Sequence, residues 1–146
     1  MSSELGRYLY LAGALPFLML GTAHALATPR APADAKGLSP FDPQLAEAMT
    51  RSTLRLTRRT DMWRAWVGFN LSHSLGVVVF AAFVFVTGRS APVFAAEAHI
   101  GIPFAFVVAA TYLWLAQRYW FRTPFIGCLL AVVLFLASWI TRMMGP

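Results

Sequence analysis

Four long apolar stretches constrain this chain more than any other feature. They lie at about residues 8–27, 65–87, 94–115 and 124–141. A helix needs about 20 mostly apolar residues to cross the hydrocarbon core of a bilayer, and each stretch meets or approaches that length. The sequence therefore predicts an all-α, polytopic membrane protein, in which four transmembrane helices form a bundle and residues 1–146 form a single membrane domain.

The composition points to the same class of protein. Hydrophobic residues make up 58% of the chain and charged residues 12%, whereas soluble domains are about half apolar and about a quarter charged. A soluble fold of 146 residues could not bury this much apolar surface, because small domains have little core for their surface. The net charge of +6 would suggest nucleic acid in a soluble protein, but the placement of the charges favours a membrane and no nucleic-acid partner.

Aromatic residues mark the ends of the apolar stretches. Amphipathic rings prefer the level of the lipid headgroups, where they form belts. The residues that fall near stretch ends are Tyr8, Tyr10, Trp63, Trp66, Trp114, Tyr119, Trp120 and Trp139. Their spacing supports the four predicted spans.

The basic residues predict an orientation. Nine of them lie between the first and second stretches or between the third and fourth, and three (Arg7, Arg89 and Arg142) belong to the other side. Cytoplasmic loops carry the excess of Lys and Arg. The basic loop is therefore predicted to be cytoplasmic and both termini to lie outside.

A second interpretation concerns residues 1–27. One early basic residue, an apolar core and Ala-x-Ala patterns at Ala23–Ala25 and Ala25–Ala27 resemble a cleavable secretory signal. Cleavage would leave three helices and place the basic loop outside, against the charge rule. We therefore favour a retained first helix.

The sequence of the long loop, residues 28–64, predicts a further helix within it. Asp42-Pro43 is a helix start signal, with an N-cap followed by proline at the first helical position. From about residue 43, apolar residues recur at helical spacing, and Arg51, Arg55, Arg58 and Arg59 line an adjacent face. We expect a basic amphipathic helix that leads into the second span and contacts anionic headgroups. The alternative is a charged, solvated face.

The second span holds two distinct polar faces. Trp63, Trp66, Asn70 and His73 fall on one face at steps of three and four residues. Gly68, Ser72 and Gly76 fall on another, four residues apart, in the small-xxx-small pattern that lets helices approach closely. We predict helix packing through the second face, with this helix at the centre of the bundle.

His24, at the end of the first span, is expected near Asn70 and His73, because antiparallel helices bring these ends together. Three interpretations of this group are open. The favoured one is structural, with hydrogen bonds across helices. The second is a pocket for a quinone or lipid-like amphiphile, with Trp63 and Trp66 as walls. The third and least favoured is bis-histidine haem ligation; no other metal site is expected.

No catalytic arrangement is apparent, so we assign no catalytic residues and favour a protein that is not an enzyme. His73 lies between Ser72 and Ser74, but neighbours on a helix point about 100° apart, which rules out a Ser-His pair. Glu97 is the one carboxylate within the spans, near a boundary, so paired-acid chemistry lacks support. Cys128 is the single cysteine, so no intramolecular disulfide can form.

Two motifs carry a resemblance to a known family. Gly21-Thr22-Ala23-His24 in the first span and the run from Trp66 to Gly76, WVGFNLSHSLG, resemble a family of small bacterial four-helix integral membrane proteins without assigned function. The resemblance implies a four-helix bacterial protein and nothing about activity. Because the sequence shows no credible catalytic set, and because it has a small-residue face and a basic amphipathic helix, we expect a non-catalytic accessory or assembly subunit of a complex in the bacterial inner membrane. Its expected partners are other membrane subunits or further copies of this chain.

Overall fold

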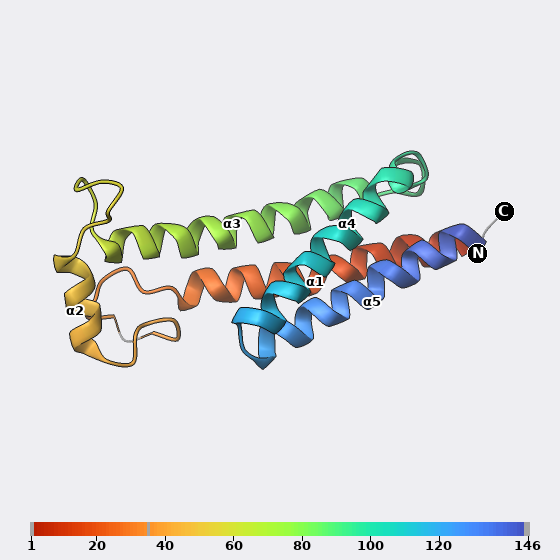
Figure 1. The fold of residues 1–146 in the computed structure, drawn as a ribbon. Coiled ribbons are helices and arrows are strands. Elements are labelled where there is room, and N and C mark those ends of the chain that lie inside the picture. Colours follow the sequence, from red (N-terminus) through yellow and green to blue (C-terminus); the bar gives the residue numbers. More distant parts are fainter. Residues whose placement is uncertain (1, 35, 145–146) are drawn as a thin grey trace. The chain divides into compact units, whose positions relative to one another are not determined.

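The computed structural model describes residues 2–34 and 36–144, and these residues form an all-α protein. Its helices are α1 (Ser2–Ala27), α2 (Pro43–Arg51), α3 (Met62–Gly88), α4 (Ala91–Tyr119) and α5 (Arg122–Met144) (Figure 1). All but α2 are long and apolar enough to cross a membrane. The four predicted spans are confirmed, and each helix extends a few residues beyond its apolar stretch at one end or at both.

The end of α1 follows from its local sequence. Thr28 precedes Pro29, and the residue before a proline is disfavoured in helical geometry. The Arg30 guanidinium donates to the carbonyl oxygens of Thr28 and, at 2.8 Å, of Ala25. The last carbonyl groups of a helix have no N–H partner within the helix, and the Arg30 side chain supplies hydrogen-bond donors to two carbonyl groups at this end.

The helix in the long loop is shorter than expected. It starts as predicted, with the Asp42 carboxylate accepting from the Gln44 amide at 2.8 Å, but it ends at Arg51. The expectation that it leads into the second span is wrong. Asp61 accepts from the Arg64 amide at 2.8 Å and so caps the start of α3, and a capping residue has non-helical backbone geometry. Residues 52–61 form a loop closed by an antiparallel bridge between Thr53 and Asp61.

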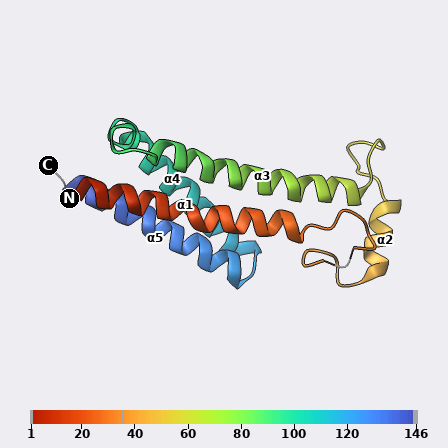
Figure 2. The same cartoon turned by 180° about the vertical axis from the view of Figure 1, so that it is seen from behind.

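The chain divides into two compact units, residues 21–76 and residues 1–20 with 77–146. The first of these, here called the loop unit, holds the last part of α1, α2, and the first part of α3. Within it, α2 lies beyond the helix ends with its axis turned across theirs (Figure 1 and Figure 2). Ala46 of α2 is buried, whereas Leu45 is exposed.

The other unit, here called the helical unit, has an aromatic core between small residues. The rings of Phe17 and Phe80 meet edge to face at 5.0 Å, and Tyr10 meets Phe135 in the same way at 5.7 Å. Alanines with no exposed surface lie between them: Ala14, Ala81, Ala105, Ala109 and Ala131. The ring of Tyr10 is buried in this core, and the headgroup level expected for it stays a prediction. α1 extends further towards the N-terminus than its apolar stretch, so Tyr10 lies well inside the helix.

Glycines allow the helices of this unit to approach closely. A Cβ atom added at Gly13 would lie 2.6 Å from the Phe135 ring, and one at Gly127 would lie 2.6 Å from Leu20. At the other end, the Ser138 hydroxyl donates to the Gly6 carbonyl at 2.8 Å. The start of α1 therefore packs along the length of α5.

Candidate functional site

The polar residues singled out in the sequence come together within the loop unit. His24 lies in the last turn of α1, and Asn70 and His73 lie one turn apart in α3. His24 Nε2 lies 2.8 Å from Asn70 Oδ1, and the two histidine rings meet edge to face at 5.1 Å. The structure thus brings these three side chains into one cluster, here called the His–Asn cluster.

Asn70 determines the proton position on His24. Its Nδ2 group donates to the Trp66 carbonyl at 2.8 Å, so Oδ1 must face His24. Because an amide oxygen only accepts, the proton of this hydrogen bond belongs to His24 Nε2. Asn70, which is 8% exposed, therefore has both ends of its amide occupied within the protein.

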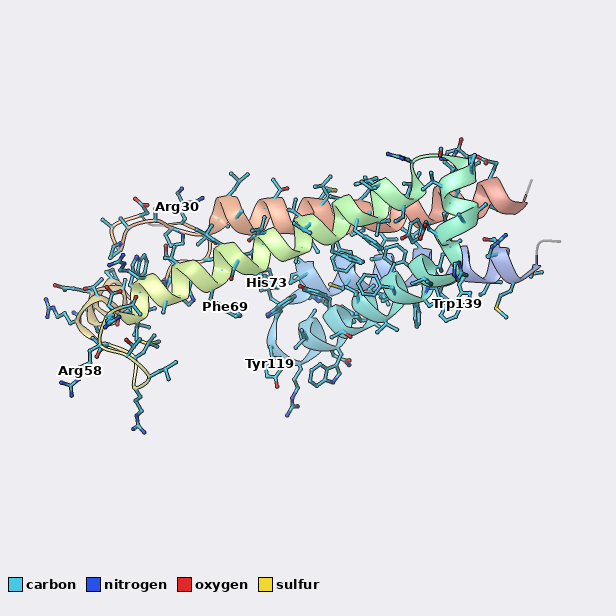
Figure 3. The ribbon with its side chains drawn as sticks, turned by 90° about the horizontal axis from the view of Figure 1, so that it is seen from above. Arg30, Arg58, Phe69, His73, Tyr119 and Trp139 are labelled. Atoms are coloured by element: carbon cyan, nitrogen blue, oxygen red, sulfur yellow. The ribbon has the colours of Figure 1, made fainter. Side chains whose placement is uncertain are left out.

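His73 is the third member of the cluster. Its ring is half-buried and stacks over Phe69 at 6.4 Å, with 12° between the ring planes (Figure 3). Ser74, the next residue, is buried and donates its hydroxyl to the Asn70 carbonyl at 2.9 Å. The aromatic and hydrogen-bonding contacts hold this turn of α3 in place.

The two tryptophans lie on the same helix as Asn70 and His73, and Trp63 is the more buried of the two. Their rings pack at 5.4 Å. Trp63 is 4% exposed, and its indole N–H has no acceptor within the described residues. An unpaired buried donor costs about 1–3 kcal/mol, so a water molecule or a ligand oxygen there would stabilise the fold.

The geometry of the cluster limits its chemistry. Axial haem ligands present their ring nitrogens to one iron from opposite faces of a porphyrin. Here His24 Nε2 donates to Asn70, and the ring centroids are 5.1 Å apart, which leaves no space for a porphyrin between the rings. The described residues contain no group of three or more metal-ligating side chains. Ser72 donates to the Phe69 carbonyl, so it is not paired with a base.

The small-residue face of α3, formed by Gly68, Ser72 and Gly76, is open. All three residues are exposed, and a Cβ atom added at either glycine would meet nothing within 4 Å. Helix packing through Gly68, Ser72 and Gly76 and the central position of α3 therefore both stay predictions.

The basic residues predicted to contact headgroups are exposed. Arg51 ends α2 and pairs with Glu47. Arg55, Arg58 and Arg59 lie in the loop over residues 52–61 rather than on a helix, and Figure 3 shows Arg58 there. That loop also exposes Leu56 almost completely, at 95%. Headgroup contact by these arginines stays a prediction, with a loop in place of a helical face.

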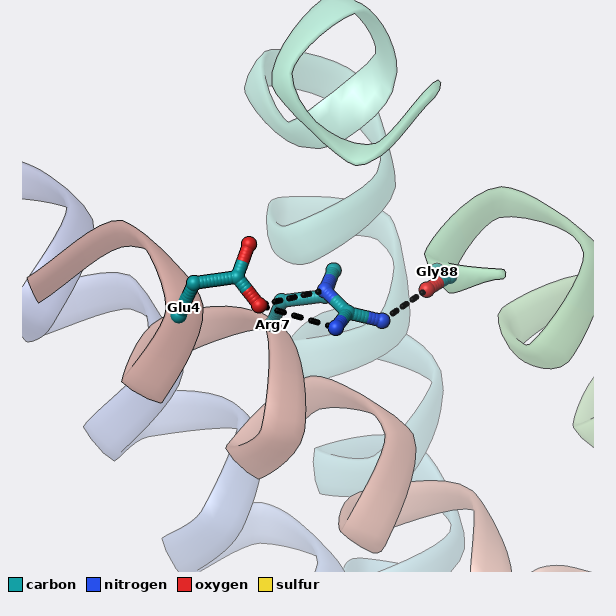
Figure 4. A network of polar contacts seen from close by, with 3 residues as sticks. All are labelled: Glu4, Arg7 and Gly88. Carbon is teal, nitrogen blue, oxygen red and sulfur yellow. Dashed lines mark hydrogen bonds and ion pairs between the residues drawn. The ribbon is translucent and has the colours of Figure 1, made fainter. Parts of the chain in front are cut away.

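Sequence reasoning missed a second polar group, which lies in the helical unit. The Tyr10 and Thr87 hydroxyls are 3.0 Å apart, and Thr87 also donates to the Phe83 carbonyl, so Tyr10 is the donor. Arg7 donates to the Glu4 carboxylate at 2.8 Å and to the Gly88 carbonyl at 3.3 Å (Figure 4). The spacing of Glu4 and Arg7 on one helix was the available signal, whereas the contact with the end of α3 had none.

Comparison with known proteins adds no identity. No family model, no curated protein and no solved structure matches this chain.

Proposed function

We propose that this protein is a non-catalytic membrane subunit that acts through helix contacts with another membrane protein. It would serve as an accessory or assembly subunit of a complex in the bacterial inner membrane. The small-residue face of α3 is the surface that would receive the partner helix.

The observation that carries this proposal is a contrast between glycines of the same chain. A Cβ atom at Gly6, Gly13, Gly88 or Gly127 would lie under 3.0 Å from a side chain of another helix, whereas one at Gly68 or Gly76 would meet nothing within 4 Å. Small residues in membrane helices let backbones approach, and helix association in lipid depends on such packing. Gly6, Gly13, Gly88 and Gly127 thus lie where another helix of this chain packs closely. Gly68 and Gly76 have no such neighbour within the described residues, so a helix of another protein could pack against them.

The His–Asn cluster supports a structural role rather than a reaction. Asn70 uses both ends of its amide within the protein, and Ser72 bonds to its own helix. Groups that satisfy each other hold helices together, whereas a nucleophile needs a base within hydrogen-bond reach. The cluster would hold α1 and α3 in the arrangement that presents the small-residue face.

The experiment compares leucine substitutions on two exposed faces of the loop unit. The double variant Gly68→Leu/Gly76→Leu adds two bulky side chains at positions where no other atom of this chain would be displaced. The control variant Ala23→Leu adds one at an exposed position of α1. After crosslinking in native membranes and mild purification, we expect one membrane protein to copurify stoichiometrically with the wild type and with Ala23→Leu. The double glycine variant should lose it.

Two results would overturn the proposal. The first is a wild-type protein that purifies as a monomer without a partner after crosslinking. The second is equal recovery of the partner with all variants. A homodimer that the leucines disrupt would support the surface but contradict the role as a subunit of a larger complex.

A second candidate function is the binding of a quinone or lipid-like amphiphile. One observation favours it, the buried Trp63 indole N–H without an acceptor, which an oxygen of such a ligand could accept. Trp63→Phe should then remove a small molecule from organic extracts of the purified protein, and Trp66→Phe should retain it. Identical extracts from wild type and Trp63→Phe would contradict this function.

A further inference from the structure

The helical unit carries an open groove on α4 that the sequence did not indicate. It has a volume of about 340 Å³, and it is lined by Phe106, Val107, Ala110, Thr111 and Trp114. All five lining residues belong to α4 and the groove is open, so it can seat a segment of an apolar chain along the helix surface but does not enclose a ligand. It lies in a helix that can span a membrane, where lipid chains are the solvent.

The lining of the groove suits an apolar chain. Its one hydroxyl group, on Thr111, donates to the Val107 carbonyl at 2.9 Å, which leaves the indole N–H of Trp114, at one end of the groove, as the remaining side-chain donor. One wall is held in place from outside α4, because the Phe106 ring packs edge to face against Trp139 at 5.7 Å. Figure 3 shows Trp139 beside α4 in this unit.

The groove continues into a basic end. Val107, Thr111, Trp114 and Arg118 follow one another at steps of four, three and four residues, so they share one stripe of the helix. Trp114 and Tyr119 pack edge to face at 6.3 Å, both exposed, and exposed rings of this kind lie at headgroup level. Arg118 is therefore next to the headgroups, one turn beyond the groove.

The charge at this end is entirely positive. Residues 98–144 contain no Asp or Glu, and Arg118 and Arg122 are both exposed. Neither arginine has a carboxylate partner among the residues that the structure describes. An anionic headgroup would supply the missing negative charge, and guanidinium groups bind phosphate through paired N–H donors.

We propose that this stripe of α4 is a binding site for an anionic glycerophospholipid. One acyl chain lies in the groove between Phe106 and Trp114, and the phosphate binds Arg118 with Arg122. The polarity of the site matches the lipid along its length, from hydrocarbon through the interfacial Trp114 to the charged end. The site is separate from the small-residue face, and it does not depend on the proposed subunit function.

The test measures lipid binding to the full chain by native mass spectrometry in detergent. The probes are phosphatidylglycerol and phosphatidylcholine with identical acyl chains. Wild-type protein should bind phosphatidylglycerol more tightly. Arg118→Gln with Arg122→Gln should reduce that affinity towards the phosphatidylcholine value, by about fivefold per arginine, as expected for a basic residue near an anionic surface. Ala110→Leu fills the groove and should weaken the binding of both lipids.

Three control variants keep the test specific. Arg142→Gln removes a charge from the other end of α5, and Ala82→Leu adds bulk at an exposed position of α3; both should bind like the wild type. A triple variant that combines Arg55→Gln, Arg58→Gln and Arg59→Gln tests whether the loop unit is the source of the preference for phosphatidylglycerol. The proposal is overturned if the wild type does not discriminate between the lipids, if both site variants bind like the wild type, or if only the loop variant loses the preference.

Discussion

A single hydrogen bond joins residues 46 positions apart in the loop unit, from His24 Nε2 to Asn70 Oδ1. The other end of the Asn70 amide is also paired, because Nδ2 donates to the Trp66 carbonyl. In lipid, an amide that lost these partners could not turn to water. The pair therefore stabilises one arrangement of the end of α1 against the start of α3.

A double-mutant cycle of His24→Ala and Asn70→Ala should reveal this coupling. Hydrogen bonds between membrane helices average about 0.6 kcal/mol in such cycles, and we expect a coupling of that size in the free energy of unfolding. Unfolding would be measured in mixed detergent micelles containing increasing SDS. Ser72→Ala serves as the control, because its exposed hydroxyl bonds only to its own helix, and it should change stability by less than about 0.5 kcal/mol. Strictly additive effects of His24→Ala and Asn70→Ala would contradict the role of this bond.

Asp34 organises the turn that follows α1, and this turn should depend on pH. Backbone amides of Ala31 and Arg30 each donate to its carboxylate at 3.1 Å, which holds the pKa of Asp34 below its usual value of 3.8. Because the folded-state pKa is the lower one, the carboxylate stabilises the turn above pH 3.8. This stabilisation is lost as the pH falls through the folded-state pKa.

NMR titration of the full chain in micelles would measure this effect. We expect the Asp34 carboxyl carbon and the Ala31 amide to shift together, with a midpoint below 3.8. Asp34→Asn should remove the pH dependence of the Ala31 amide signal. A midpoint at or above the usual value would contradict the hydrogen-bonded turn.

At the scale of the helices, glycine occurs in two different surroundings, one closely packed and one open. Gly13 of α1 faces the Phe135 ring, with only 2.6 Å for an added Cβ, whereas Gly68 of α3 faces open space. The aromatic ring at Gly13 is itself fully buried, so it has little freedom to move. Helix packing in the helical unit thus depends on the absence of a side chain at this position.

Alanine at these two glycines should have opposite effects. Gly13→Ala overpacks the contact with α5 and should lower the free energy of unfolding by about 1–3 kcal/mol. Gly68→Ala should be neutral or stabilising by up to about 1 kcal/mol, because alanine is the better helix former. Unfolding of both variants under identical detergent conditions gives the comparison. Equal destabilisation by the two substitutions would show that the open face of α3 is occupied.

The loop unit shows where helical periodicity misleads. Apolar residues from Leu45 to Trp63 recur at helical spacing, yet the chain leaves the helix after Arg51. Asp61 accepts a hydrogen bond from the Arg64 amide and caps the start of α3. A capping residue has non-helical backbone geometry, so a continuous helix from Pro43 into the second span could not pass through Asp61.

At the scale of the whole molecule, the distribution of basic residues predicts the orientation in the membrane. This prediction can be tested by thiol labelling in a Cys128→Ala background, which removes the one native, buried cysteine. Gln44→Cys reports on the basic loop, and Ala91→Cys reports on the connection between α3 and α4. In spheroplasts, a membrane-impermeant maleimide should label Ala91→Cys, and it should label Gln44→Cys only after permeabilisation. The reverse pattern would contradict a cytoplasmic basic loop.

The sequence by itself determined the four spans, the start of α2 at Asp42-Pro43 and the group of His24, Asn70 and His73. These features depend on contiguous apolar length, on local capping and on helical spacing, and none of them needs knowledge of a distant contact. The tertiary structure decided the rest. It buried Tyr10 in the core, aligned Gly13 with Phe135, left Gly68 and Gly76 open, and formed the groove beside Trp114. In a chain that is apolar on nearly every face, hydrophobicity cannot distinguish a side chain that faces a helix from one that faces lipid, so only packing makes that distinction.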